Sequence, residues 1–186
     1  MNKASYKPKL FTKQQGMTFI EVIIALVIIV IGILGAVALQ ATAKKSSFDA
    51  MQRSLASSLA QGMIARIRAN NVANLADYAR DDYGVVLDAP PAVDCKVANV
   101  PCNASQIVIY DIYEWERALA GGDVTNNRNA AGGIVDGRGC IFRNGNAMTV
   151  VVSWQGRDAI TDNVNNENCG TAGSKRRQVI VQAFII

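Results

Sequence analysis

A long uncharged stretch is the first pattern along the chain. No Asp, Glu, Lys or Arg occurs from Val22 to Ala43. A helix rises about 1.5 Å per residue, so about twenty apolar residues cross the hydrocarbon core of a bilayer, which is about 30 Å thick. The pattern therefore predicts a membrane-spanning helix over residues 17–43.

Helical spacing continues beyond this stretch but becomes amphipathic. Apolar residues recur at every third or fourth position over residues 44–70, and most charged residues fall on other faces. These apolar positions are Phe48, Met51, Leu55, Leu59, Met63 and Ile67. We expect one helix from about Thr18 to Asn70, whose second half lays an apolar face against the rest of the chain.

A turn-rich segment and a second helix are expected next. Residues 72–103 are rich in turn-forming residues, including Asp81-Asp82-Tyr83-Gly84, so they predict an irregular segment. Ser105 is a suitable N-cap for a helix over about Gln106–Ala120, which Gly121-Gly122 ends. The side chains expected on its buried face are Ile109, Ile112, Tyr113 and Leu119.

The spacing changes to strict alternation in the last third of the chain. Gly139–Arg143 and Ala147–Trp154 read as strands of a hairpin around Asn144-Gly145-Asn146, and Gln178–Ile186 reads as a final strand. Three antiparallel strands packed on the amphipathic helix would bury both apolar faces. We therefore expect an α+β fold, with residues 71–186 forming a globular head.

The net charge is concentrated at the N-terminus. The chain carries a formal charge of +4, and residues 1–16 contain four lysines and no acid, which leaves 15 basic and 15 acidic residues in the remainder. A neutral remainder argues against nucleic-acid binding. The triplet Lys175-Arg176-Arg177 is better explained as the solvated start of a strand. The basic leader is expected to remain cytoplasmic while the head crosses the inner membrane.

Four cysteines and no histidine restrict the chemistry further. An even number of cysteines beyond a membrane span predicts two disulfides in an oxidising compartment. Three connectivities are possible, and we favour Cys95–Cys102 within the irregular segment and Cys140–Cys169 between a strand and a loop. A zinc site is disfavoured, since the chain has no Cys-x-x-Cys pair and no histidine, and we expect no metal or cofactor.

No catalytic motif is apparent in the sequence. The chain has no histidine-based triad and no phosphate-binding loop, so we do not expect an enzyme. The paired carboxylates Asp81-Asp82, and Glu114 with Glu116, are expected on a solvated surface. Trp115 and Trp154 are expected in the core.

The junction Gly16-Met17-Thr18-Phe19-Ile20-Glu21 joins the basic leader to the apolar stretch. Glu21 is a lone carboxylate at the start of an apolar run that lipid would surround. Placing a charged group in lipid costs free energy, so Glu21 is a candidate functional residue. The arrangement resembles the class III signal of type IV prepilins. That resemblance implies that a prepilin peptidase cuts between Gly16 and Met17 and N-methylates Met17. Glu21 would then pair with the Met17 amine of a neighbouring subunit and set the register of assembly.

Four further segments resemble the PilV branch of the minor pilins. They are Gly35–Gln40, Met63–Asn70, Asp111–Trp115 and Thr149–Trp154. The resemblance implies the type IV pilin fold and a subunit that joins other minor pilins, the major pilin and a tip adhesin. Such a subunit helps to prime the pilus and reaches the cell surface, where it serves twitching motility and adhesion. The chain departs from the branch at Leu119-Ala120-Gly121-Gly122 and at Met17, where that branch has Leu-Pro-x-Gly and Phe.

Two other assignments remain open. A type II secretion pseudopilin of the I type shares the N-terminal design and much of the head. An ordinary secreted protein is the other, because Ala41-Thr42-Ala43 imitates a signal-peptidase site after an apolar run. The run is longer than the usual signal-peptide core of about 7–15 residues, and Glu21 interrupts it, which disfavours the secreted protein.

Overall fold

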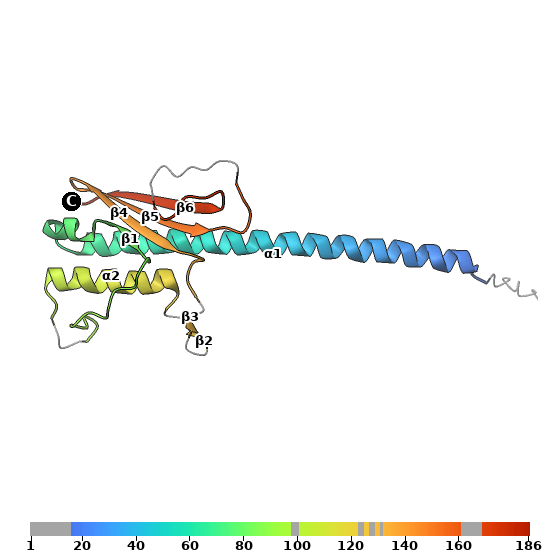
Figure 1. Ribbon diagram of the computed structural model, residues 1–186, viewed down its shortest axis with the longest axis horizontal. Coiled ribbons are helices and arrows are strands. Elements are labelled where there is room, and N and C mark those ends of the chain that lie inside the picture. The colour runs from blue at the N-terminus through green and yellow to red at the C-terminus, as the bar shows by residue number, and fades with distance from the viewer. Residues whose placement is uncertain (1–15, 98–100, 123–124, 127–128, 131, 161–168) are drawn as a thin grey trace, which may run out of the picture. The chain divides into compact units, whose positions relative to one another are not determined.

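The computed structural model describes residues 16–97, 101–122, 125–126, 129–130, 132–160 and 169–186 (Figure 1). The chain divides into two compact units, Met1–Lys44 and Lys45–Ile186. Most of the expected leader and part of the loop before the last strand lie outside the described residues.

Helix α1, Phe19–Ala69, runs through both units and confirms the predicted long helix. In the first unit all of its side chains are exposed. The mean hydropathy of its most apolar 18-residue window is 3.3, so the helix is long and apolar enough to cross a membrane. Apolar side chains exposed over such a length match a lipid environment better than water.

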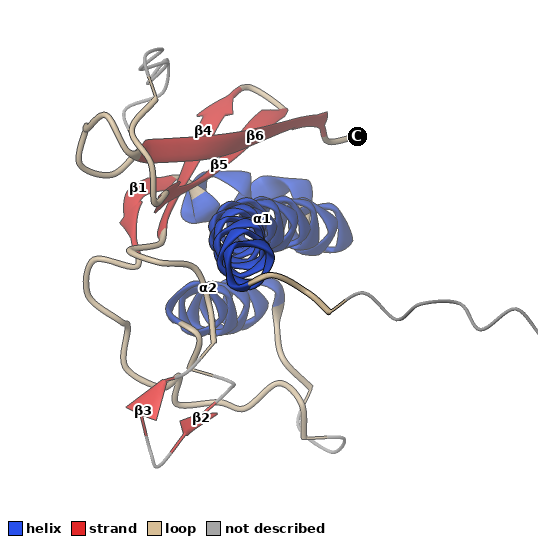
Figure 2. Cartoon of the chain, turned by 90° about the vertical axis from the view of Figure 1, so that its right-hand side faces the viewer, coloured by secondary structure: helices blue, strands red, loops and turns tan. Residues whose placement is uncertain are grey.

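In the second unit, α1 packs against a four-stranded antiparallel sheet of order β1-β4-β5-β6. The strands are β1 Arg80–Tyr83, β4 Arg138–Asn144, β5 Ala147–Gln155 and β6 Arg176–Phe184. Figures 1 and 2 show residues 45–69 of α1 between this sheet and α2, Ala104–Ala120. The predicted α+β fold, a long apolar N-terminal helix with a small antiparallel sheet, is confirmed.

The predicted hairpin is present at β4 and β5. Asn144 pairs with Ala147, so Gly145 and Asn146 form a two-residue turn. Gly145 has a φ of +60°, which favours glycine in such a turn. The hairpin register places Cys140 opposite Val151 in the centre of the sheet.

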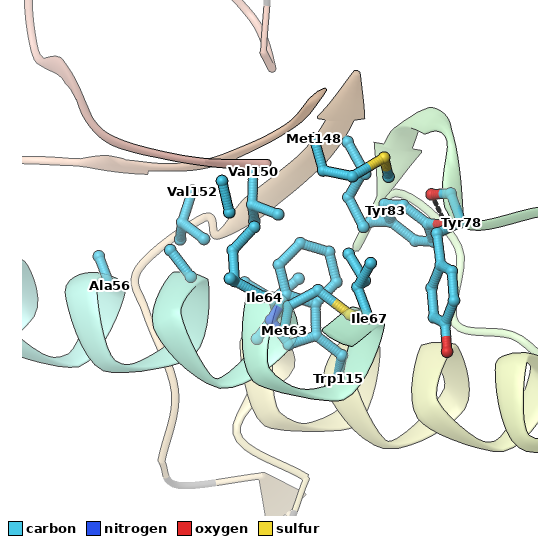
Figure 3. Close-up of a cluster of buried hydrophobic side chains, with 14 of the residues drawn as sticks. Ala56, Met63, Ile64, Ile67, Tyr78, Tyr83, Trp115, Met148, Val150 and Val152 are labelled. Atoms are coloured by element: carbon cyan, nitrogen blue, oxygen red, sulfur yellow. Dashed lines mark hydrogen bonds between the residues drawn. The ribbon is translucent and has the colours of Figure 1, made fainter. Parts of the chain in front are cut away.

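The buried face of α1 agrees with the expected stripe at Met63 and Ile67 and differs from it elsewhere. Met51 is 56% exposed, whereas the buried positions are Gln52, Ala56, Ala60, Met63, Ile64 and Ile67. The expected stripe was chosen from the largest apolar side chains. The sheet instead packs against the small Ala56 and Ala60, with Val150 and Val152 on the facing strand (Figure 3). Small side chains allow a strand to approach a helix closely. A prediction from the spacing of large apolar residues overlooks alanines at such positions.

The turn expected at Asp81-Asp82-Tyr83-Gly84 is wrong, since residues 80–83 form the edge strand β1. An edge strand tolerates exposed charges, so Asp81 and Asp82 can lie in one. Strand prediction relies on apolar and β-branched residues, and these two aspartates are neither. Tyr83 is fully buried and contacts the ring of Trp115 edge-on, with the ring centroids 5.2 Å apart. Its hydroxyl donates a 2.7 Å hydrogen bond to the carbonyl of Tyr78.

Helix α2 begins earlier than predicted. Asn103, not Ser105, is the N-cap, and it forms a capping box with Gln106. Ile109 is exposed rather than buried. The buried positions are Val108, Asp111, Trp115, Glu116 and Leu119. Leu119 is buried as predicted, and Ile112 packs partly buried against the core. Two of the five buried residues are carboxylates, which apolar spacing does not select.

The core of the second unit joins α1, the sheet and α2 (Figure 3). Trp115 and Trp154 are both buried in it, as predicted. The indole Nε1 of Trp115 donates a 3.0 Å hydrogen bond to the carbonyl of Leu59. Short elements complete the unit. They are a 3-10 helix, Val72–Tyr78, and a two-stranded ladder of Thr125–Asn126 with Asn129–Ala130.

Candidate functional site

The candidate processing and assembly residues lie at the start of α1, in the first unit. The helix begins at Phe19, so Thr18 is its N-cap and Glu21 is the third helical residue. One carboxylate oxygen of Glu21 accepts hydrogen bonds from the Thr18 amide at 2.7 Å and the Thr18 hydroxyl at 3.0 Å. The Glu21 amide in turn donates to the Thr18 hydroxyl at 3.4 Å. This reciprocal arrangement is a capping box.

Thr18 is therefore a site residue that our sequence analysis missed. The spacing Thr18-x-x-Glu21 before an apolar run is a capping-box signal, and it was available in the sequence. The box gives Glu21 a fixed position one turn into the helix. Its carboxylate lies next to the backbone that follows Met17.

The Gly16–Met17 bond is open to its surroundings. A Cβ added at Gly16 would meet no atom within 4 Å, and Met17 is 80% exposed. The described residues therefore place no steric requirement on glycine at this position. A requirement for Gly16 would have to come from an external binding site, such as the subsite of a peptidase.

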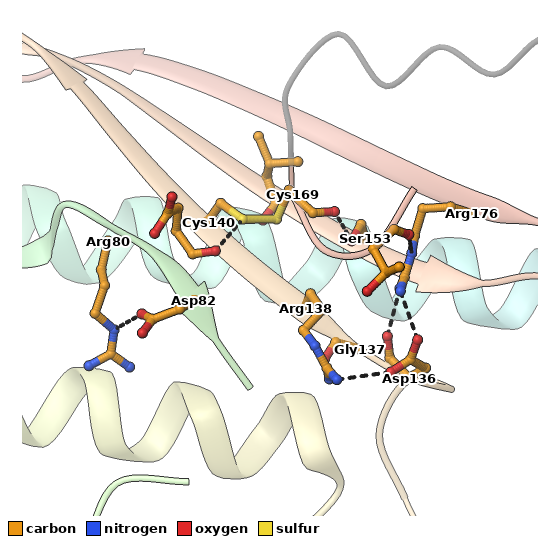
Figure 4. The surroundings of a disulfide bond; sticks show 12 residues. Arg80, Asp82, Asp136, Gly137, Arg138, Cys140, Ser153, Cys169 and Arg176 are labelled. Atoms are coloured by element: carbon orange, nitrogen blue, oxygen red, sulfur yellow. Dashed lines mark hydrogen bonds and ion pairs between the residues drawn. A yellow bond between two sulfur atoms is a disulfide. The ribbon is translucent and has the colours of Figure 1, made fainter. Parts of the chain in front are cut away.

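The four cysteines all lie in the second unit and form two disulfides, Cys95–Cys102 and Cys140–Cys169. These are the pairings that we favoured from the sequence. Cys140 and Cys169 form a small buried cluster with Val151 on the sheet (Figure 4). The Ser153 hydroxyl donates a 2.7 Å hydrogen bond to the carbonyl of Cys169, so the bond and the disulfide fix this end of the loop to the sheet.

The basic triplet is a solvated strand start only at Lys175, which is exposed directly before β6, and the expectation is wrong for the two arginines. Arg176 is buried and donates to both the carbonyl and the carboxylate of Asp136, at 2.8 and 2.7 Å. Arg177 pairs with Asp49 of α1 at 3.3 Å. Alternating side chains of β6 reach opposite faces of the sheet, so two neighbouring arginines find separate acids. Because both arginines are paired with acids, they offer little unpaired positive charge for binding a polyanion such as nucleic acid.

A polar cluster links α1 to α2 in the second unit. Arg66 bonds to Asp111 at 2.8 Å and to Glu114 at 3.1 Å. Tyr78 donates a 2.9 Å hydrogen bond to the second carboxylate oxygen of Asp111, and burial raises the pKa of Tyr78 strongly. Burial also raises the pKa of Glu114, but the bonds from Lys96 and Arg66 more than offset this effect and hold it below its ordinary value. This cluster aligns α1 with α2.

Glu116 is fully buried, so the solvated surface expected for it is wrong. Its carboxylate accepts a 2.6 Å bond from Arg80 and further bonds from the backbone amides of Gly84, at 3.3 Å, and Asp88, at 3.0 Å. Burial raises the pKa of Glu116 above its ordinary value, despite these donors. The partners of Glu116 lie on β1 and in the loop after it. The spacing of apolar residues in the sequence does not predict that these segments pack against α2.

Asp81 and Asp82 are exposed, as predicted. Over the described part of the chain, no cluster of three or more His, Cys, Asp or Glu side chains could hold a metal ion.

Two family models match successive parts of the chain. A model described as the prokaryotic N-terminal methylation motif matches residues 11–37, which include Gly16, Met17 and Glu21. A model described as type IV pilin Tt1218 matches residues 38–113, which include the second half of α1 and the start of α2. No curated protein and no solved structure matches the chain significantly. The exposed apolar helix and the α+β second unit agree with the two matches, and the chain is similar to type IV pilins over residues 38–113 and to the N-terminal methylation motif over residues 11–37.

Proposed function

We propose that this chain is a minor pilin of the type IV pilus, cut by a prepilin peptidase between Gly16 and Met17 and N-methylated at Met17. The observation that carries the proposal is the match of residues 11–37 to the methylation motif, a stretch that contains the exposed Gly16–Met17 bond. Type IV pilins are structural proteins and not enzymes, which fits the lack of a catalytic motif in the sequence.

Glu21 is the proposed assembly residue. Cleavage converts the Met17 amide into a free amine, which carries a positive charge. This cation would lie at the same depth in the membrane as the Glu21 carboxylate. When helices pack side by side away from water, each of these charges requires a partner. Pairing the Met17 amine of one subunit with Glu21 of its neighbour satisfies both and fixes the axial register. Because the leader blocks the amine, assembly depends on processing.

The minor role rests on the PilV-like segments. Such a subunit would join other minor pilins and the major pilin, help to prime the filament and support a tip adhesin, and so serve twitching motility and adhesion. Before assembly it would cross the inner membrane once, with a cytoplasmic N-terminus and a periplasmic head over residues 71–186. Two disulfides in the second unit fit the oxidising periplasm.

The test is the co-purification of other pilin subunits with the chain from detergent-solubilised membranes, together with a count of surface pili. Glu21→Val should be cleaved and stable, since an apolar residue is favoured in a spanning helix, yet it should lose its partners and reduce piliation. Glu21→Gln should fail more mildly, because it keeps the hydrogen bonds and loses the charge. Thr42→Val is the matched control, since it removes a polar group from the same helix without removing a charge.

Thr18→Val separates charge pairing from helix capping. It removes the hydroxyl of the capping box and leaves the Glu21 charge in place. If Thr18→Val loses partners as completely as Glu21→Gln, the role of Glu21 is to cap its own helix and the pairing proposal is wrong. A deletion strain distinguishes the pseudopilin alternative, because loss of twitching with intact secretion supports the pilus and the reverse supports the secretion system.

A further inference from the structure

The loop that follows β1 exposes three consecutive apolar side chains. Val85, Val86 and Leu87 are 59%, 76% and 50% exposed. We call these three residues the apolar knuckle. Single exposed apolar residues are ordinary on a protein surface, but contiguous ones mark a place that another surface covers.

The knuckle is held rigidly at both ends by one buried carboxylate. Glu116 accepts hydrogen bonds from the amide of Gly84, just before the knuckle, and from the amide of Asp88, just after it. Arg80 clamps the same loop, since its guanidinium bonds to Glu116 and also to Asp88 at 3.2 Å. Arg138 adds a 2.9 Å hydrogen bond to the carbonyl of Gly84.

Burying the Glu116 carboxylate to anchor this loop costs free energy, which suggests that the ordered loop has a functional role. A carboxylate that is fully buried costs free energy unless donors surround it, and all of the bonds that Glu116 accepts come from Arg80 and the loop ends. A loop that is already ordered loses less conformational entropy when it binds. The arrangement therefore resembles a preorganised apolar anchor and not a loosely packed turn.

The charges beside the knuckle indicate the chemistry of the partner. Arg80 pairs with Asp82 (Figure 4) and also with Asp88 and Glu116. The exposed Asp81 adds a further negative charge. The positive charge of Arg138 is paired with Asp136 at 3.1 Å. An apolar tip on a net negative base fits an apolar recess with a cationic rim.

We propose that the knuckle docks into such a recess on the head of another pilin subunit, with Glu116 as the positioning residue. This inference rests on the proposed function and deepens it, because it names the surface of the head that meets a partner. The Glu21 pair acts between the helices in the membrane, whereas the knuckle acts between heads outside it.

Site-specific photo-cross-linking in the native cell tests the contact directly. A benzophenone amino acid is placed at Val86 of the full chain, and at Ile109 as the control, which is exposed on α2. The adduct is identified by mass spectrometry. We expect the Val86 adduct to contain a second subunit with an N-terminal methylation motif. Adducts with lipid alone, or equal yields at Val86 and Ile109, would overturn the inference.

Substitutions measure how much the knuckle contributes. Val85→Ser, Val86→Ser and Leu87→Ser together should reduce the co-purified pilin subunits by about tenfold or more, as expected when a central apolar anchor is lost. Ile109→Ser with Ile180→Ser removes exposed apolar area elsewhere and should have no effect. If wild-type chain recovers no such subunits, the proposed function fails. If both wild-type and the serine variant recover them equally, only the knuckle inference fails.

Glu116→Gln tests the positioning role. It should lower the cross-linking yield at Val86 while the yield at Ile109 stays unchanged, because only the loop loses its anchor. General unfolding of the head would change both yields, and an unchanged yield at Val86 would show that Glu116 does not position the knuckle.

Discussion

Two glutamates of this chain lie in opposite surroundings, and both depend on their neighbours in the chain. Glu21 is exposed and bonds to Thr18, three residues away, so its local geometry follows from the sequence spacing. Glu116 is buried and bonds to Arg80, Gly84 and Asp88, which are 28 to 36 residues away in the chain. The first environment could be predicted from the sequence and the second could not, because it depends on how β1 packs on α2.

Glu114 gives a prediction about acid stability. Its pKa is lowered in the folded chain from an ordinary value of 4.5, so its contribution is present above that value and is lost as the pH falls through the lower folded value. The wild-type head should therefore lose stability on acidification. Glu114→Gln should lose less over the same pH range, measured by urea unfolding of the chain in detergent with tryptophan fluorescence.

Glu116→Gln is the control of opposite sign. The pKa of Glu116 is raised by burial, so its contribution is present at low pH and is lost as the pH rises through the folded value. This variant should not reduce the acid sensitivity. An acid response in Glu114→Gln that equals the wild-type response would show that the bonds from Lys96 and Arg66 do not control it.

At the scale of elements, the sequence predicted those whose signals are local. The long helix, the β4–β5 hairpin and the final strand each follow from periodicity or from a two-residue turn. Strand β1 was missed because it is short, charged and at the sheet edge, and its assignment depends on pairing with β4, more than fifty residues later. Part of the buried face of α2 was missed because it carries Asp111 and Glu116, although Leu119 is buried as predicted.

The two disulfides give a prediction at this scale. The chain-entropy model predicts a cost of roughly 3–4 kcal/mol for removing Cys140–Cys169, whose cysteines are 29 residues apart. It predicts roughly 2–3 kcal/mol for Cys95–Cys102, which are 7 residues apart. Paired Cys→Ala variants, compared by urea unfolding, should follow this order. The reverse order, or peptide mapping that joins Cys95 to Cys140 or Cys169, would contradict the account.

At the scale of the whole molecule, the account depends on one covalent event. The net positive charge of the sequence comes from the expected leader, the apolar stretch begins directly after it, and the match to the methylation motif covers the boundary. The fold class could be predicted because a long apolar helix followed by an amphipathic segment and alternating strands has few packed solutions. Partners could not be predicted to the residue, since their surfaces are not encoded in the periodicity of this chain.

The mature N-terminus tests the central claim most directly. Mass spectrometry of the membrane-extracted protein should find a chain that begins at N-methylated Met17. Gly16→Val should leave the leader in place and hold the uncut protein in the inner membrane, because a bulky side chain cannot enter a subsite suited to glycine. A mature chain that begins at Lys44, after Ala41-Thr42-Ala43, would instead identify a secreted protein and contradict the account.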